Sequence, residues 1–124
     1  MIYIWLNIVP ILIAALASVG LAGLIYGRKA APATLAIVFL AQAWLAAILA
    51  GALILAPPKG GVWTMTIGSA VVIWAGFVAP TLAASYRLRA QSWRTIGIDG
   101  GYWLAAMVMQ AIIMRVLGLV PPPA

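Results

Sequence analysis

The sequence contains no cysteine, no histidine and only one acidic residue among its 124 positions. The lack of cysteine and histidine excludes disulfides, a thiolate nucleophile, a Cys/His metal site and the usual axial ligands of haem iron. A single carboxylate also cannot supply the acid–base pair, or the nucleophile with its base, on which most hydrolytic and transfer enzymes depend. We therefore expect a protein that is not an enzyme and that holds no metal or other cofactor.

Charge of either sign is scarce, because 6% of the residues are charged and 67% are hydrophobic. A soluble domain carries roughly 25% charged residues. The surface of this chain is therefore expected to face lipid. Its seven Lys and Arg residues fall in the short gaps between apolar runs and form no dense basic patch. We expect membrane lipids around the chain, and neither a nucleic-acid partner nor a soluble small-molecule substrate.

Four apolar stretches predict four transmembrane helices, because a helix needs roughly 20 apolar residues to cross the hydrocarbon. The predicted spans cover residues 2–26, 33–56, 62–86 and 93–120, in a single transmembrane domain over residues 1–124. The first stretch has no basic residue before it and continues to Tyr26, which favours a retained helix over a signal peptide. Since all connections are short, the predicted fold is all-α, an up-down bundle of four antiparallel helices.

The distribution of Lys and Arg predicts the orientation of these helices. The first and third connections hold Arg28, Lys29, Arg87, Arg89 and Arg94, whereas the other side holds Lys59 and, near the last helix end, Arg115. Positive charge gathers on the cytoplasmic side of membrane proteins. We therefore expect a multi-pass protein of the bacterial inner (cytoplasmic) membrane, with both termini on the periplasmic side.

Asp99, the only acid, lies about six residues into the fourth predicted helix. An ionisable group at membrane depth raises the hypothesis of a proton or cation site. A structural role is the favoured alternative, because the helix dipole stabilises an acid near a helix start and Arg87, Arg89 and Arg94 are available as partners.

Other polar residues within the spans have structural explanations. Arg115 is expected to extend to the outer interface, where it meets lipid phosphate, or to contact another subunit. It lies roughly 24 Å along the helix from Asp99, too far to pair with it. Gln42, Gln110 and Asn7 are expected to form hydrogen bonds between helices, since an unpaired amide in lipid is costly.

Small residues and tryptophans mark candidate helix contacts. Gly23 and Gly27 form one GxxxG pair and Gly97 and Gly101 a second, while Ala43, Ala47 and Gly51 continue the spacing in the second helix. Such stripes indicate close helix packing, either within the chain or between chains.

Two tryptophans and two prolines fall inside the predicted spans. Trp44 and Trp74 lie near mid-span, where core packing is the favoured explanation and a site for a sterol, quinone, carotenoid or partner protein the alternative. Pro80 is expected to kink the third helix, and Pro10 to bend the first, because proline removes a helix hydrogen bond.

Three segments together resemble a known family. These are Trp-Ala-Gly-Phe-Val-Ala-Pro-Thr at 74–81 followed by Trp93, Ile-Asp-Gly-Gly-Tyr-Trp-Leu at 98–104, and Gly-Leu-Ile-Tyr-Gly at 23–27. Over nearly its whole length the chain resembles the bacterial domain-of-unknown-function family 1761. It departs from that family at Asp99-Gly100, where Asn-Ala is expected, and at Ile25, where Trp is expected. The resemblance implies a small four-helix membrane protein and brings no established activity.

Three functions are compatible with such a chain. The favoured hypothesis is a non-catalytic accessory or structural subunit that packs against a larger membrane complex of the respiratory or photosynthetic type. Its partners are then other transmembrane subunits or a second copy of itself. The alternatives are a small homo-oligomeric transporter or channel, whose pathway Asp99, Gln42 and Gln110 would line, and a protein that binds lipid or another hydrophobic ligand.

Overall fold

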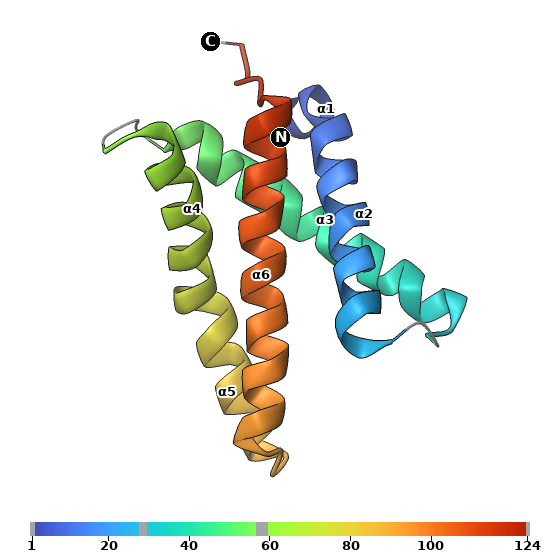
Figure 1. Ribbon diagram of the computed structural model, residues 1–124. Coiled ribbons are helices and arrows are strands. Elements are labelled where there is room, and N and C mark those ends of the chain that lie inside the picture. The colour runs from blue at the N-terminus through green and yellow to red at the C-terminus, as the bar shows by residue number, and fades with distance from the viewer. Residues whose placement is uncertain (1, 28–29, 57–59, 124) are drawn as a thin grey trace.

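The computed structural model describes residues 2–27, 30–56 and 60–123. These residues form helices joined by short connections, and no strand occurs among them. In chain order the elements are α1 (Ile2–Leu6), α2 (Ile8–Tyr26), α3 (Pro32–Leu55), α4 (Val62–Ile73), the π-helical turn η1 (Trp74–Val78), α5 (Ala79–Leu88) and α6 (Trp93–Leu117) (Figure 1). The helices Ile8–Tyr26, Pro32–Leu55, Val62–Leu88 and Trp93–Leu117 are long and apolar enough to cross a membrane. The all-α prediction is therefore confirmed. Arg28, Lys29 and Lys59, used above for the orientation, lie outside the described residues.

The helices differ from the predicted spans mainly in two places. The first span is interrupted at Asn7, between α1 and α2. Pro10 has no N–H to donate to the carbonyl of Leu6, so the interruption lies one turn before the proline. The last helix ends at Leu117 and not at Val120, because Gly118 has φ +89° and its N–H bonds to the carbonyl of Met114. Such a glycine is the common way to end a helix.

The third span, α4–η1–α5, is distorted beside Pro80, as predicted, although the distortion is a π-helical turn. The N–H of Ala79 bonds to the carbonyl of Trp74, five residues back. Since Pro80 has no N–H to continue the ladder, one backbone carbonyl loses its donor there. The Thr81 hydroxyl compensates nearby by donating to the carbonyl of Phe77. Single π-turns of this kind are frequent at functional sites.

Helix α6 is the centre of the molecule. It packs against α2, α3, α4 and α5, and α2 packs along α3. Figure 1 shows α6 between α2 and the α4–α5 segment, with α3 crossing behind and both chain termini at the same end. The contact between α3 and α4 is smaller than the contacts of either helix with α6, and the two diverge away from the end where the termini lie.

The core lies where α2, α3 and α6 meet. It combines alanines, which allow close approach, with larger side chains such as Ile11, Leu49 and Met107. The third span contributes little, since 6% of its most apolar window is buried, against 39% for α6. Most large apolar side chains of the third span therefore face outward, as lipid or another helix requires.

Candidate functional site

Four polar side chains meet in the core, and we call them the polar cluster: Ser18 on α2, Gln42 on α3, and Tyr102 and Gln110 on α6. Gln42 Nε2 donates to Tyr102 Oη at 2.8 Å, and Tyr102 Oη donates to the carbonyl of Ser18 at 2.9 Å. Gln110 Nε2 donates to Ser18 Oγ at 2.8 Å and to Gln42 Oε1 at 2.6 Å. All four residues are buried, so the cluster joins three helices where water has no access.

The prediction that Gln42 and Gln110 bond between helices is confirmed by this cluster. The sequence did not reveal their partners, although Tyr102 stands eight residues before Gln110 and so lies on the same helix face. Ser18 donates to the carbonyl of Ala14 within its own helix and also accepts from Gln110. Among the described residues, only Gln110 Oε1 is a buried side-chain polar atom without a partner.

Asn7 has a different role from the predicted bond between helices. Its Nδ2 donates to the carbonyls of Tyr3 and Val120, each at 2.8 Å, and its Oδ1 accepts from the N–H of Val120 at 2.6 Å. Tyr3 lies one turn earlier, in α1, and the long-range partner is the non-helical C-terminal segment and not another spanning helix. Asn7 therefore ties the interruption of the first span to the end of the chain.

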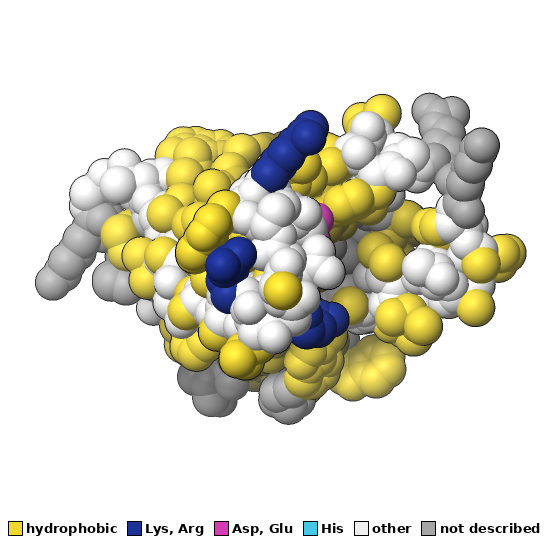
Figure 2. Space-filling view, turned by 90° about the horizontal axis from the view of Figure 1, so that it is seen from below, with side chains coloured by type: hydrophobic (Ala, Val, Ile, Leu, Met, Phe, Trp, Pro, Cys, Tyr) yellow, Lys and Arg dark blue, Asp and Glu magenta, His cyan; other side chains and the backbone are white. Residues whose placement is uncertain are grey.

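Asp99 is held by a tyrosine of another helix. Tyr26 Oη, at the end of α2, donates to Asp99 Oδ1 at 2.5 Å. The carboxylate is half-buried between the helices. In Figure 2, which views the end opposite the termini, the acidic side chain is visible only in a recess. A hydrogen bond from the end of α2 therefore holds Asp99 in place.

The predicted pairing of Asp99 with an arginine is wrong for the described residues. Arg87 lies 5.1 Å from the centre of the Trp93 ring and donates to the carbonyl of Gln91. Arg89 lies 5.3 Å from the Tyr86 ring. Cation–π contacts at the helix ends direct these guanidinium groups outward, whereas Asp99 lies deeper on α6. Figure 2 shows the basic side chains at this end standing apart from one another.

Arg115 is fixed by two neighbouring helices. Its Nε donates to Thr66 Oγ1 on α4 at 2.9 Å, and one terminal nitrogen lies 3.4 Å from the carbonyl of Leu53 on α3. It borders a pocket of about 270 Å³. Thr66 is fully buried and also donates to the carbonyl of Val62 within its own helix.

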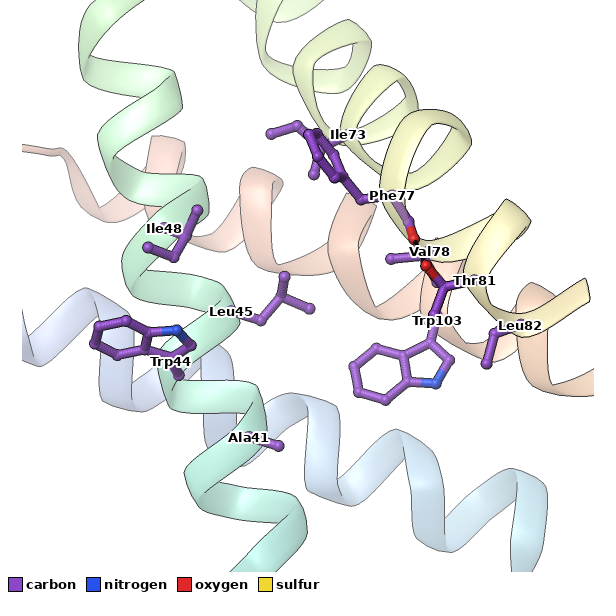
Figure 3. Close-up of a pocket in the computed structure, with 10 residues that line it drawn as sticks. All are labelled: Ala41, Trp44, Leu45, Ile48, Ile73, Phe77, Val78, Thr81, Leu82 and Trp103. Carbon is purple, nitrogen blue, oxygen red and sulfur yellow. Dashed lines mark hydrogen bonds between the residues drawn. The ribbon is translucent and has the colours of Figure 1, made fainter. Parts of the chain in front are cut away.

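An apolar groove opens where α3 diverges from the third span. Its volume is about 570 Å³, and α3, α6 and the third span from Ile73 to Leu82 line it. Figure 3 shows the rings of Trp44 and Trp103 on opposite sides of the groove and Leu45 pointing between them. Trp44 and Phe77 are 60% and 72% exposed, so neither is part of the core. Core packing, favoured above for both mid-span tryptophans, does not describe Trp44.

Trp74, the other mid-span tryptophan, does pack within the chain. It is half-buried, contacts the hydrophobic core, and donates its indole N–H to the carbonyl of Gly100 at 2.9 Å. This bond joins the π-helical turn to α6. The core-packing prediction is confirmed for Trp74.

The two GxxxG pairs do not bring helices of this chain together. A Cβ added at Gly23, Gly27, Gly97 or Gly101 would meet no atom within 4 Å. Gly97 and Gly101 border a groove of about 360 Å³ between the third span and α6, and Gly23 and Gly27 border one of about 520 Å³ between α2 and α3. The α3 stripe behaves differently, because a Cβ at Gly51 would lie 2.9 Å from the hydroxyl of Tyr3.

No protein-family model matches the chain, and no curated protein or solved structure matches it either. The resemblance to family 1761 therefore stays a prediction.

Proposed function

We propose that the chain is a non-catalytic accessory subunit that packs its helices against a larger complex in the bacterial inner membrane, such as a respiratory or photosynthetic complex. In this proposal the four helices cross the bilayer antiparallel, with both termini on the periplasmic side. The resemblance to a family of small four-helix membrane proteins agrees with it.

The glycines on the outer helix surfaces carry the proposal. Gly97 and Gly101 on α6, and Gly23 on α2, have open space where a side chain would be. Each glycine costs a helix interior roughly 1 kcal/mol relative to alanine. Contact with lipid does not explain a glycine at these positions, since alanine or leucine packs against acyl chains equally well. Glycine in a membrane helix permits the close approach of another backbone, and within this chain no backbone approaches these positions.

The low burial of the third span supports the same conclusion. Gly97 and Gly101 lie in the groove beside that span, and the groove lined by Trp44 lies on its other side. The third span is therefore bordered by one open groove on the side of α3 and by another on the side of α6. A partner helix in either groove would cover apolar surface that the chain itself leaves uncovered.

The contacts of the polar side chains support a transporter or channel less well than they support an accessory subunit. Gln42 and Gln110 are bonded to each other and to Tyr102 and Ser18, and the Asp99 carboxylate accepts from Tyr26. Residues expected to line a pathway are thus occupied in joining helices.

A second candidate function is the binding of a hydrophobic ligand in the groove of Figure 3. The observation that favours it is the aromatic lining by Trp44, Phe77 and Trp103, which is typical of sites for apolar molecules. The two candidates differ in what leaves the membrane with the protein: a stoichiometric partner chain in the first, a bound small molecule in the second.

The test is purification of the tagged protein from its native membrane in mild detergent, with quantification of the chains that co-elute. We expect Gly101→Leu, whose Cβ meets no atom of this chain within 4 Å and whose side chain extends into the glycine groove, to lower the recovery of the partner at least tenfold. Ala36→Leu introduces the same side chain at an exposed α3 position outside the described grooves and should leave the recovery unchanged. A wild-type chain that elutes free would contradict the proposal, and one that elutes only with itself would show that the partner is a second copy.

The topology has its own test, because the chain contains no thiol of its own. A cysteine in place of Gln91, in the connection between α5 and α6, should react with an impermeant reagent only after the cells are opened. A cysteine in place of Pro122 should react in intact spheroplasts. The opposite pattern would reverse the proposed orientation.

A further inference from the structure

Arg115 presents a guanidinium held in one place with most of its donors unused. An arginine side chain has five N–H donors. Of these, Nε bonds to Thr66 and one terminal N–H points to the carbonyl of Leu53, at a long 3.4 Å. Within the described residues the other three N–H groups have no acceptor. Because Nε is fixed on a fully buried hydroxyl, the terminal nitrogens keep a constant direction.

No acidic side chain can neutralise this arginine. The only acid of the sequence, Asp99, lies sixteen residues earlier on the same helix, roughly 24 Å away, and is held by Tyr26. A half-buried cation without an anion is costly close to the hydrocarbon, and arginines there pair with a counter-charge or with lipid headgroups. The charge therefore requires an anion that the side chains of this protein do not provide.

The pocket beside Arg115 has the shape and polarity that such an anion needs. It holds about 270 Å³ and is enclosed by the end of α3, the beginning of α4, the end of α6 and the C-terminal segment. Apart from Arg115 its lining is apolar, with Ile54, Val62 and Met65 among the wall residues. Helix α4 starts at this pocket, and Gly61 before it offers no side-chain cap. The free N–H groups of its first turn add positive potential at the same end.

We propose that this pocket binds the phosphodiester of an anionic phospholipid from the outer leaflet, with the phosphate on the free edge of Arg115. The planar fork of arginine donates two parallel hydrogen bonds to phosphate oxygens, which a lysine cannot do. The apolar walls contact the glycerol and the first methylene groups, which free phosphate lacks. An anionic headgroup is preferred over a zwitterionic one because no acidic side chain is present to bind a choline or ethanolamine. The proposal requires that the helices span a membrane, and its outer-leaflet position rests on the orientation proposed above. It does not depend on the chain being a subunit.

Lipid retention in native mass spectrometry tests the proposal. The full chain is released from nanodiscs that contain equal amounts of phosphatidylglycerol and phosphatidylcholine. We expect one phosphatidylglycerol to stay on the wild type, and its occupancy relative to phosphatidylcholine to fall about tenfold in Arg115→Gln. Arg94→Gln is the matched control, because Arg94 lies at the opposite end of α6. The phosphatidylglycerol occupancy of this variant should stay within about twofold of the wild type.

A second variant keeps the arginine and fills the pocket. Val62→Trp places a large side chain at an exposed wall position in the first turn of α4. It should lower phosphatidylglycerol retention as strongly as Arg115→Gln does. Retention at the wild-type level in either variant would overturn the proposal. So would displacement of the lipid by millimolar inorganic phosphate, because that result would assign the site to the free anion.

Discussion

The polar cluster makes a quantitative prediction through Gln42 and Gln110. Replacing either glutamine by methionine keeps the length of the side chain and removes its hydrogen bonds. Gln110→Met removes the bonds to Ser18 and Gln42, and Gln42→Met removes those to Tyr102 and Gln110. A hydrogen bond between membrane helices contributes about 0.6 kcal/mol on average, so each variant should lose about 1.2 kcal/mol of unfolding free energy.

The double variant decides whether the two glutamines bond to each other. They share one bond, the 2.6 Å contact of Gln110 Nε2 with Gln42 Oε1, so the double variant loses three bonds and not four. It should lose about 1.8 kcal/mol, which is about 0.6 kcal/mol less than additivity requires. Gln110→Met also removes the buried Oε1 that has no partner, which raises the unfolding free energy. This increase is the same in the single Gln110→Met variant and in the double variant, so it cancels in the cycle.

The assay is reversible unfolding in mixed micelles of dodecyl sulfate, followed by the fluorescence of the native tryptophans. A control cycle combines Gln110→Met with Asn7→Ala. Asn7 lies eleven residues before Ser18, roughly 16 Å along the helix, and shares no hydrogen-bond partner with Gln110. These two changes should add within about 0.3 kcal/mol. Equal additivity in the Gln42–Gln110 cycle would refute the shared bond.

Two further predictions use the same assay. Tyr26→Phe should lose about 1 kcal/mol because it removes the hydroxyl that donates to Asp99, whereas Asp99→Asn should lose less because its amide oxygen still accepts. A larger loss in Asp99→Asn would show that the negative charge, and not the hydrogen bond, stabilises this contact. Gly51→Ala should lose about 1 to 3 kcal/mol, because its Cβ would lie 2.9 Å from the Tyr3 hydroxyl. Gly68→Ala, which meets no atom within 4 Å, should be neutral or gain up to about 1 kcal/mol, and equal losses in both would refute the contact.

The helical class and the four apolar spans follow from the sequence because lipid offers no hydrogen bonds to the backbone. Every N–H and C=O in the hydrocarbon must then be paired inside the segment, and a long apolar run has only the helix available. The same reasoning predicted that Gln42 and Gln110 would bond between helices. It also placed the distortion of the third span at Pro80, since a missing N–H is a local property of one residue.

The partners of the polar residues could not be predicted in this way. Asp99 was expected to pair with an arginine and instead accepts from Tyr26, which lies 73 positions away in the sequence. Arg115 contacts Thr66 and Leu53, two residues that no pattern singled out. Each of these contacts depends on how far two helices are rotated about their axes and at which depth they cross.

The sequence by itself thus determined that the chain is helical, where its four apolar spans lie and which side chains need a partner. Only the tertiary structure decided which faces turn inward, that α3 diverges from the third span, and that the GxxxG pairs remain open. The physical reason lies in the helices themselves. They are apolar on all sides, so no amphipathic stripe indicates the inner face. The few buried polar groups and the small residues of the core settle the rotation of each helix, and they act only once the helices meet.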